Sequence, residues 1–304
     1  MVKAATSYEP DIPLSLELPS PQRGSPDEYL YRFNPSTALG KGVERTGTGL
    51  RGHAELTIVL ATINERENLA SLLGQIRTVA GTEPELVIVD DGSVDGTRDV
   101  ILSAAKTDPR VRYVFNGAPR TIVGAHLQGI ALSTTEYVIV MDSDLQHPAD
   151  LIPPILHSLK QGYDVVVASR YKPGGSPGPR SPWRGLISRV AAVMARRAVR
   201  NARGLSDPVS GFFGVRRDGF APIDGCVRGF ETLLFVLASA DNPNVTEIPY
   251  CFQERGNGES KVLRGWTFLR VFLVQLLVAK RLELEIRRTK RGVTSRKPSR
   301  MEKD

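Results

Sequence analysis

Apolar, β-branched runs alternate with helical patterns along the first part of the chain, and this alternation constrains the fold most. The runs cover residues 56–62, 86–90, 111–115, 137–142 and 164–169. Between them, stretches such as 65–79 and 97–106 place apolar residues at helical spacing. Strands that alternate with helices form parallel sheets covered on both faces. The sequence therefore predicts a single α/β domain with a mostly parallel, Rossmann-like sheet flanked by helices.

Acidic side chains follow three of these strands. The first runs into ATINERE, the second into VDDGSVDGT and the fourth into MDSDLQH. Ligands of such sheets lie at the carboxyl ends of the strands, so these acids should gather along one edge. A single aspartate there is often only a helix cap or a turn residue. Several on successive strand ends favour a binding site; they are Glu65, Asp90, Asp91, Asp142 and Asp144.

Two carboxylates one residue apart suit a hard divalent cation. Mg²⁺ and Mn²⁺ prefer oxygen ligands, keep several waters, and bind through one or two carboxylates together with substrate phosphates. Asp142 and Asp144, with Gln146 on the same side of an extended segment, form such a half-shell. We therefore expect Mg²⁺ or Mn²⁺ as the cofactor, with a diphosphate completing its coordination.

The loop after the second strand suits a nucleotide. Gly92 and Gly96 allow a tight turn close to a ligand, and Asp91 offers two acceptor oxygens to the N–H groups of a nucleobase. The chain lacks a Walker lysine motif and a G-x-G-x-x-G after the first strand, which disfavours kinases and dinucleotide oxidoreductases. The pattern favours a nucleoside diphosphate that carries a further group.

Positive charge is concentrated in two places. Residues 165–206 contain no acid, and residues 280–304 hold most of the net charge of +7. Both stretches predict an anionic partner, with a solvated basic helix face as the plain alternative for the first. The basic residues of the acid-free stretch are Arg170, Lys172, Arg180, Arg184, Arg189, Arg196, Arg197, Arg200 and Arg203.

Length and composition indicate how the chain divides into a folded domain and its two ends. A chain of 304 residues, 41% hydrophobic, can bury one large core. Cys226 and Cys251 match neither a disulfide framework nor a zinc site, so reducing cytosol is expected. The opening residues are rich in Pro, Gly, Ser and charge and resemble no signal peptide. We expect a disordered extension over 1–54, the folded domain over 55–279 and a basic tail over 280–304.

Two segments predict contact with a membrane surface. Residues 183–203 place apolar side chains on one helix side and arginines on another, as on anionic lipid, although a core-packed helix has the same pattern. Residues 266–279 are apolar but shorter than the roughly 20 residues that span a bilayer, so they predict a buried or membrane-dipping helix. We expect no transmembrane helix and a peripheral position on the cytosolic face of a membrane, aided by the basic tail.

Six segments together resemble a known family. NERENL, VDDGSVDGTRDV, MDSDLQHP, ASRY, SGFFGVRR and ERGNGESK occur in this order. They resemble the inverting family 2 glycosyltransferases, and among them the dolichol-phosphate mannose synthases. The resemblance implies a GT-A fold and transfer of mannose from GDP-mannose to dolichyl or polyprenyl phosphate. It also implies a membrane surface, and a small membrane anchor protein, as partners, and no nucleic acid.

The resemblance assigns roles to single residues. The nucleotide would contact Thr62, Asn64, Glu65, Asp91 and Asp142, and the metal Asp142, Asp144 and Gln146. The acceptor phosphate would contact Arg170, Arg184, Ser188 and Lys261, and the catalytic residues would be Asp144 and Arg255.

Two alternatives stay open. Ile63 stands where the family commonly has a tyrosine near the base, so a related transferase could use a UDP-sugar such as UDP-glucose on the same lipid phosphate. A protein of another class could retain the fold only to bind lipid or nucleic acid, for which the basic tail would suffice by charge. Asp142, Asp144 and Arg255 speak against it, because such binding does not require them.

Overall fold

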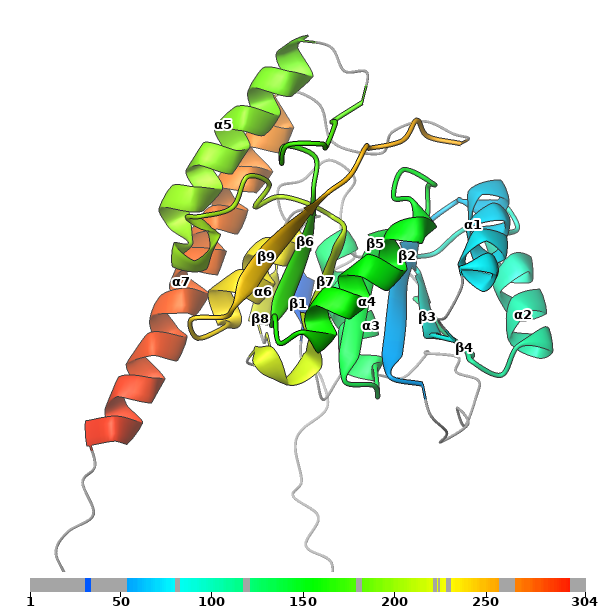
Figure 1. Ribbon diagram of the computed structural model, residues 1–304, viewed down its shortest axis with the longest axis horizontal. Coiled ribbons are helices and arrows are strands. Elements are labelled where there is room, and N and C mark those ends of the chain that lie inside the picture. Colours follow the sequence, from blue (N-terminus) through cyan, green and yellow to red (C-terminus); the bar gives the residue numbers. More distant parts are fainter. Residues whose placement is uncertain are drawn as a thin grey trace, which may run out of the picture.

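The computed structural model describes residues 31–33, 54–79, 83–116, 121–178, 182–220, 223, 225–227, 231–256 and 266–295. Within these ranges a seven-stranded sheet has the order β4-β3-β2-β5-β7-β6-β9 (Figure 1). The strands are β2 (Leu56–Thr62), β3 (Glu85–Asp90), β4 (Val111–Phe115), β5 (Tyr137–Asp142), β6 (Val165–Ser169), β7 (Phe213–Arg216) and β9 (Val245–Pro249). Only β7 runs antiparallel to its neighbours, which are β5 and β6. The predicted mostly parallel α/β sheet is confirmed.

Helices cover both faces of this sheet (Figure 1). One face packs against α1 (Arg66–Thr78), α2 (Thr97–Thr107) and α4 (Ile152–Lys160), which follows the short helix η2 (Ala149–Leu151). The other packs against α3 (Ile122–Leu132), α5 (Pro182–Ala198), α6 (Thr232–Ser239) and α7 (Trp266–Ser295). Two further short helices are η3 (Arg200–Ala202) and η4 (Arg217–Gly219).

Burial on both faces explains why the strands read as continuous apolar runs. Ile58 and Ile88 belong to one hydrophobic cluster, while Val59 and Val87 belong to the other. Side chains alternate between faces along a strand, so each strand supplies both cores. Helix α3 lies so close to β2 that a Cβ on Gly129 would be 2.3 Å from the Val59 side chain. This close contact requires glycine.

The parallel register brings the strand ends to one level. Thr62 of β2 pairs with Asp90 of β3, and Ala61 pairs with Asp142 of β5. On the far side of β3, Asp90 pairs with Phe115 of β4, so Asn116 is the first residue beyond that strand. The carboxyl ends of four strands therefore form one continuous edge.

The expectations for the two ends of the chain need correction. A short strand β1 (Tyr31–Phe33) pairs antiparallel with β8 (Gly225–Val227), so the predicted disordered extension is wrong for these three residues. Helix α7 continues through residue 280 to Ser295, so the expected boundary between domain and tail falls inside a helix. Ala279 and Glu283 are both buried, which ties this helix to the domain. No helix in the described ranges is both long and apolar enough to cross a bilayer.

Candidate active site

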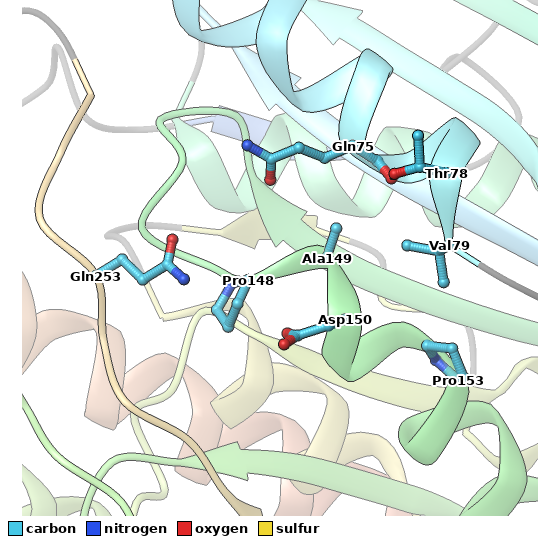
Figure 2. A pocket seen from close by; sticks show the side chains of 8 residues that line it. All are labelled: Gln75, Thr78, Val79, Pro148, Ala149, Asp150, Pro153 and Gln253. Atoms are coloured by element: carbon cyan, nitrogen blue, oxygen red, sulfur yellow. The ribbon is translucent and has the colours of Figure 1, made fainter.

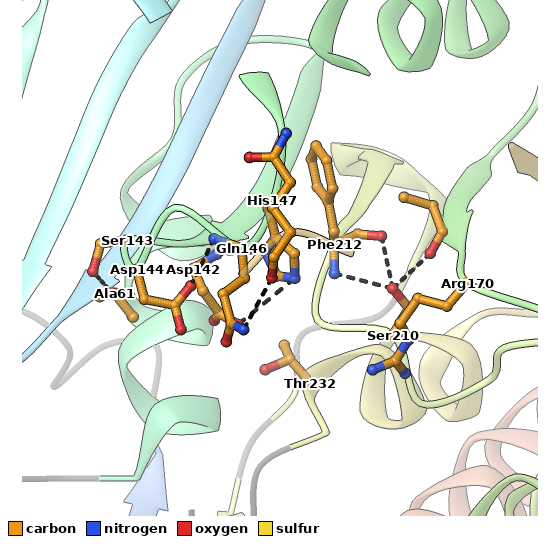
Figure 3. A network of polar contacts seen from close by, with 12 residues as sticks. Ala61, Asp142, Ser143, Asp144, Gln146, His147, Arg170, Ser210, Phe212 and Thr232 are labelled. Carbon is orange, nitrogen blue, oxygen red and sulfur yellow. Dashed lines mark hydrogen bonds and ion pairs between the residues drawn. The ribbon is translucent and has the colours of Figure 1, made fainter. Parts of the chain in front are cut away.

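The loop after β5 holds its two carboxylates in a fixed turn (Figure 3). The backbone N–H of Asp142 donates to Nδ1 of His147 at 3.0 Å, and that of Gln146 donates to Oδ1 of Asp144 at 3.1 Å. Ser143 donates its hydroxyl to the carbonyl of Ala61, which fastens the turn to β2. The predicted pair Asp142 and Asp144 is therefore presented by a rigid loop at the strand edge.

The positive charge near this carboxylate pair does not offset its desolvation and mutual repulsion. Burial, followed by the negative charges of Asp144 and Glu231, raises the pKa of Asp142 well above its usual range. Burial also raises the pKa of Asp144, although the N–H of Gln146 and the charge of Arg255 oppose the shift. Among the described residues, Oδ1 of Asp142 is buried and accepts no hydrogen bond. The side chains of Asp142 and Asp144 are 30% and 14% exposed, and a partly buried pair of like charges costs free energy unless a cation compensates it.

The residues present fit a divalent cation. No group of three or more His, Cys, Asp or Glu side chains with metal-binding geometry occurs in the part of the chain that is described. Two carboxylates suffice for Mg²⁺ or Mn²⁺ when substrate phosphates supply other ligands. Gln146 donates its amide nitrogen to the carbonyl of Gln253 at 3.2 Å, so its amide oxygen is the atom that would face a metal. Its role as a ligand remains a prediction.

Arg255 lies between two of the predicted acids. Its guanidinium forms ion pairs with Glu65 and, at 3.5 Å, with Asp144. The preceding segment is bound to the β5 loop, because the N–H of Gln253 donates to the carbonyl of Gln146 at 3.2 Å. The structure thus brings together Glu65, Asp144 and Arg255, which lie far apart in sequence. The guanidinium of Arg255 lies beside Asp144, where it could contact an anionic ligand.

The residues predicted to contact the nucleotide lie at the ends of β2 and β3. The N–H of Asp91 donates to the carbonyl of Thr62 at 2.9 Å, and its Oδ1 accepts from Asn116 at 2.8 Å. The Thr62 hydroxyl is buried with no partner in the described ranges. Asn64, with a φ of 49°, accepts the N–H of Val94 and so joins the two loops. Thr62, Asn64 and Asp91 therefore lie along one edge, and their contact with a nucleotide stays a prediction.

The sequence did not predict Asn116 and Gln128 as residues of this edge. Asn116 donates to Gln128 at 3.1 Å as well as to Asp91, and both are buried. A signal for Asn116 existed, because it follows the predicted strand 111–115 as Asp91 follows its own strand. Gln128 lies within α3 and carries no comparable signal.

Arg170, at the end of β6, is held by an acid that was not predicted. Its Nε and Nη2 donate to the two oxygens of Asp207 at 2.7 and 2.8 Å, and Asp207 is fully buried. Burial acts to lower the pKa of Arg170, but the hydrogen bonds and charge of Asp207 overcome it and raise the pKa. Asp207 is the first acid beyond the acid-free stretch, which was a usable signal. The positive charge of Arg170 also acts on Asp142.

The other predicted acceptor residues are placed only in part. Ser188 is half-buried on α5. Arg184 belongs to the first turns of the same helix, but its side chain lies outside the described part of the structure. Lys261 also lies outside the described residues. Their grouping around a phosphate stays a prediction.

A surface pocket of about 510 Å³ lies beside this site (Figure 2). Gln75 and Thr78 of α1 face Pro148, Asp150 and Gln253 across it. None of the predicted site residues lines this pocket. The carboxylate edge is therefore a separate feature, joined to the pocket through Gln253.

The family model for glycosyl transferase family 2 matches residues 57–223. The chain belongs to this family of glycosyltransferases. It is 34% identical to a dolichol-phosphate mannosyltransferase of Pyrococcus furiosus over 70% of this chain and 60% of that protein. It is 31% identical to a dolichol-phosphate mannosyltransferase of Saccharomyces cerevisiae over 68% of this chain and 81% of the yeast protein. The chain thus spans less than two thirds of the archaeal relative.

A solved structure of similar fold is glucosyl-3-phosphoglycerate synthase from Mycobacterium tuberculosis, in complex with Mn²⁺ and UDP-glucose. The TM-score is 0.53 at 18% identity, over 75% of this chain and 79% of the other. At this identity the likeness concerns the fold, and it agrees with the GT-A architecture expected from the sequence.

Proposed function

We propose that this chain transfers mannose, with inversion, from GDP-mannose to a dolichyl or other polyprenyl phosphate. The observation that carries the proposal is the Asp142–Asp144 pair, whose negative charge Arg255 and Arg170 compensate only in part, between the ends of β2 and β3 and the end of β6 that carries Arg170. The names of the two mannosyltransferase relatives support the choice of sugar and acceptor.

The carboxylate pair would handle the donor diphosphate. A divalent cation, Mg²⁺ or Mn²⁺, on Asp142, Asp144 and Gln146 would stabilise the leaving diphosphate as a Lewis acid. Arg255, paired with Glu65 and Asp144, would exchange part of these contacts for the donor phosphates. Asp144 and Arg255 would therefore carry the chemical step together.

The strand ends on the other side would hold the nucleoside. The Thr62 hydroxyl, which has no partner among the described residues, and the carboxylate of Asp91, fixed by Asn116, would offer hydrogen bonds to a base or ribose. Asn64 and Glu65 would shape the same edge from the loop after β2.

The acceptor needs cations rather than a general base. A phosphomonoester has a second pKa of roughly 6, so it is largely dianionic near neutral pH and nucleophilic as it stands. Arg170, Arg184, Ser188 and Lys261 would dock it, since arginine offers two parallel donors to a phosphate. Asp207 accepts from Nε and Nη2 of Arg170, and the carbonyl of Val209 also accepts from Nη2, so among the described contacts Nη1 is the nitrogen of Arg170 left for the phosphate.

Two helices would place the site at a membrane surface. Figure 1 shows α5 and α7 side by side at one end of the molecule, and contacts join them. Exposed apolar side chains on both suit a lipid interface; they are Leu186, Ile187, Val190, Leu273 and Leu277. We propose a peripheral position on the cytosolic face of an anionic membrane, with a small membrane anchor protein as a further partner.

The test is direct. Purified protein is incubated with Mn²⁺ or Mg²⁺, polyprenyl phosphate and either radiolabelled GDP-mannose or UDP-glucose, and the lipid phase is extracted and counted. The proposal predicts label in the lipid from GDP-mannose and loss of that label with EDTA. Label from UDP-glucose alone would establish the second candidate, a glucosyl transfer to the same lipid phosphate, which stays open because Ile63 stands where the family commonly has a tyrosine.

A further inference from the structure

Asp142 has a histidine facing each of its two carboxylate oxygens. Nε2 of His126 lies 3.9 Å from Oδ1, and Nε2 of His147 lies 3.8 Å from Oδ2. Both rings are almost wholly buried, at 2% side-chain exposure. Each nitrogen–oxygen distance is less than about 1 Å longer than the upper limit for an N–H···O hydrogen bond, which spans roughly 2.7–3.2 Å. A small movement of the carboxylate would close either gap.

The hydrogen-bond pattern assigns the proton of the neutral His147 ring and is compatible with the same tautomer for His126. Nδ1 of His147 accepts the backbone N–H of Asp142, so this neutral ring carries its proton on Nε2. Nδ1 of His126 lies 2.9 Å from the hydroxyl of Thr232, which can donate to it and leave the proton on Nε2. Nε2 of His126 and Oδ1 of Asp142 have no other partner in the described part of the chain. In this tautomer they are a donor and an acceptor that face each other.

The surrounding side chains hold at least one ring in place. His147 stacks on Phe212 at 5.0 Å between ring centres, and the edges of Tyr250 and Phe252 close around it. A Cβ on Gly211 would lie 3.3 Å from Oδ2 of Asp142 and 3.4 Å from the His147 ring. If the distance between Asp142 and His147 shortens, the carboxylate therefore moves rather than the packed ring.

We infer that His126 and His147 form an imidazole clamp that orients the carboxylate of Asp142 for the divalent cation of the proposed reaction. Neutral N–H donors hold the anion without cancelling its charge, so the charge remains available to a metal. Asp144 differs, because Arg255 neutralises part of its charge. Both histidines are positioning residues that act through Asp142, and the inference rests on the proposed metal-dependent function.

The first experiment measures Mn²⁺ binding by electron paramagnetic resonance of the full chain, alone and with GDP or UDP. Partners of metal-binding side chains typically change metal affinity by about 10–100-fold. We expect His126→Leu to weaken Mn²⁺ binding by this factor. His126→Gln, whose amide can place an N–H near the position of Nε2, should bind close to the wild-type level. His157→Leu, on the exposed side of α4, is the matched control and should not change binding.

A second variant keeps the test decisive if His126→Leu does not fold. Thr232→Val preserves shape but removes the hydroxyl that fixes the His126 tautomer, so it should also weaken Mn²⁺ binding. A purely structural role would lower the free energy of unfolding and leave Mn²⁺ affinity unchanged. Unchanged affinity in a folded His126→Leu or in Thr232→Val therefore overturns the clamp.

The same measurements separate the clamp from the proposed function. Wild-type protein that binds Mn²⁺ through the clamp but labels no lipid would refute the proposed donor or acceptor and leave the clamp standing. Wild-type protein that transfers mannose, with variants that bind Mn²⁺ normally, would refute the clamp alone. Wild-type protein that binds no Mn²⁺, with or without nucleotide, overturns both.

Discussion

Replacing Arg170 by alanine should destabilise the protein strongly, quite apart from any effect on catalysis. The guanidinium makes two hydrogen bonds of 2.7 and 2.8 Å to Asp207, and the exposed fractions of the two side chains are 11% and 0%. Removing one partner of a buried pair leaves an uncompensated charge, which costs about 3–5 kcal/mol. For a domain of this size, that lowers Tm by on the order of 10 °C.

Urea denaturation of matched variants measures this cost. Arg216→Ala is the control, because its 3.2 Å ion pair with Glu136 is about half exposed and should contribute roughly 0–1 kcal/mol. The double variant Arg170→Met/Asp207→Leu should recover much of the lost stability, since it removes both charges. A loss below about 1 kcal/mol for Arg170→Ala would refute the argument that Asp207 depends on it. Activity of Arg170→Ala is then interpretable only at temperatures where the variant is folded.

Three further predictions concern the site. Asp144→Asn should cut metal-dependent transfer on the order of 1,000-fold while the circular dichroism spectrum stays unchanged, because a Lewis acid contributes several kcal/mol; full turnover in EDTA would contradict it. Asp91→Ala should raise KM for the donor about ten- to hundredfold, and Arg184→Ala should raise KM for the lipid phosphate by the same factor. Steady-state kinetics would contradict this assignment if Asp91→Ala raised KM for the lipid phosphate and Arg184→Ala raised KM for the donor. Burial lowers the pKa of His126 and His147 to about 3, below 6.5 in the unfolded chain. The free energy of unfolding should therefore be independent of these rings above about pH 6.5 and fall as pH is lowered toward 3, because the unfolded chain binds the protons first. A ¹⁵N NMR spectrum that shows either ring protonated in the folded protein at pH 5 would contradict this.

Local sequence was sufficient for five strands of the sheet and for its acidic edge, but not for β7 and β9. A strand buried on both faces must be apolar along its whole length, so the runs ending at Thr62, Asp90 and Asp142 are visible without any partner. Parallel strands bring their carboxyl ends to one edge, so the acids that follow them were predictable as neighbours. The register confirms this, because Thr62 pairs with Asp90 and Ala61 with Asp142.

Tertiary structure alone decided which charges compensate one another. Asp207 pairs with Arg170 across 37 positions, and Arg255 reaches Glu65 across 190. His126 lies in α3, where a helical pattern indicates burial but not that its ring faces Asp142. Helix α7 runs past residue 280 because Ala279 and Glu283 pack on the domain, although composition there indicates a solvated tail. Periodicity reports which face of an element is buried, whereas a contact between distant elements depends on how the whole chain packs.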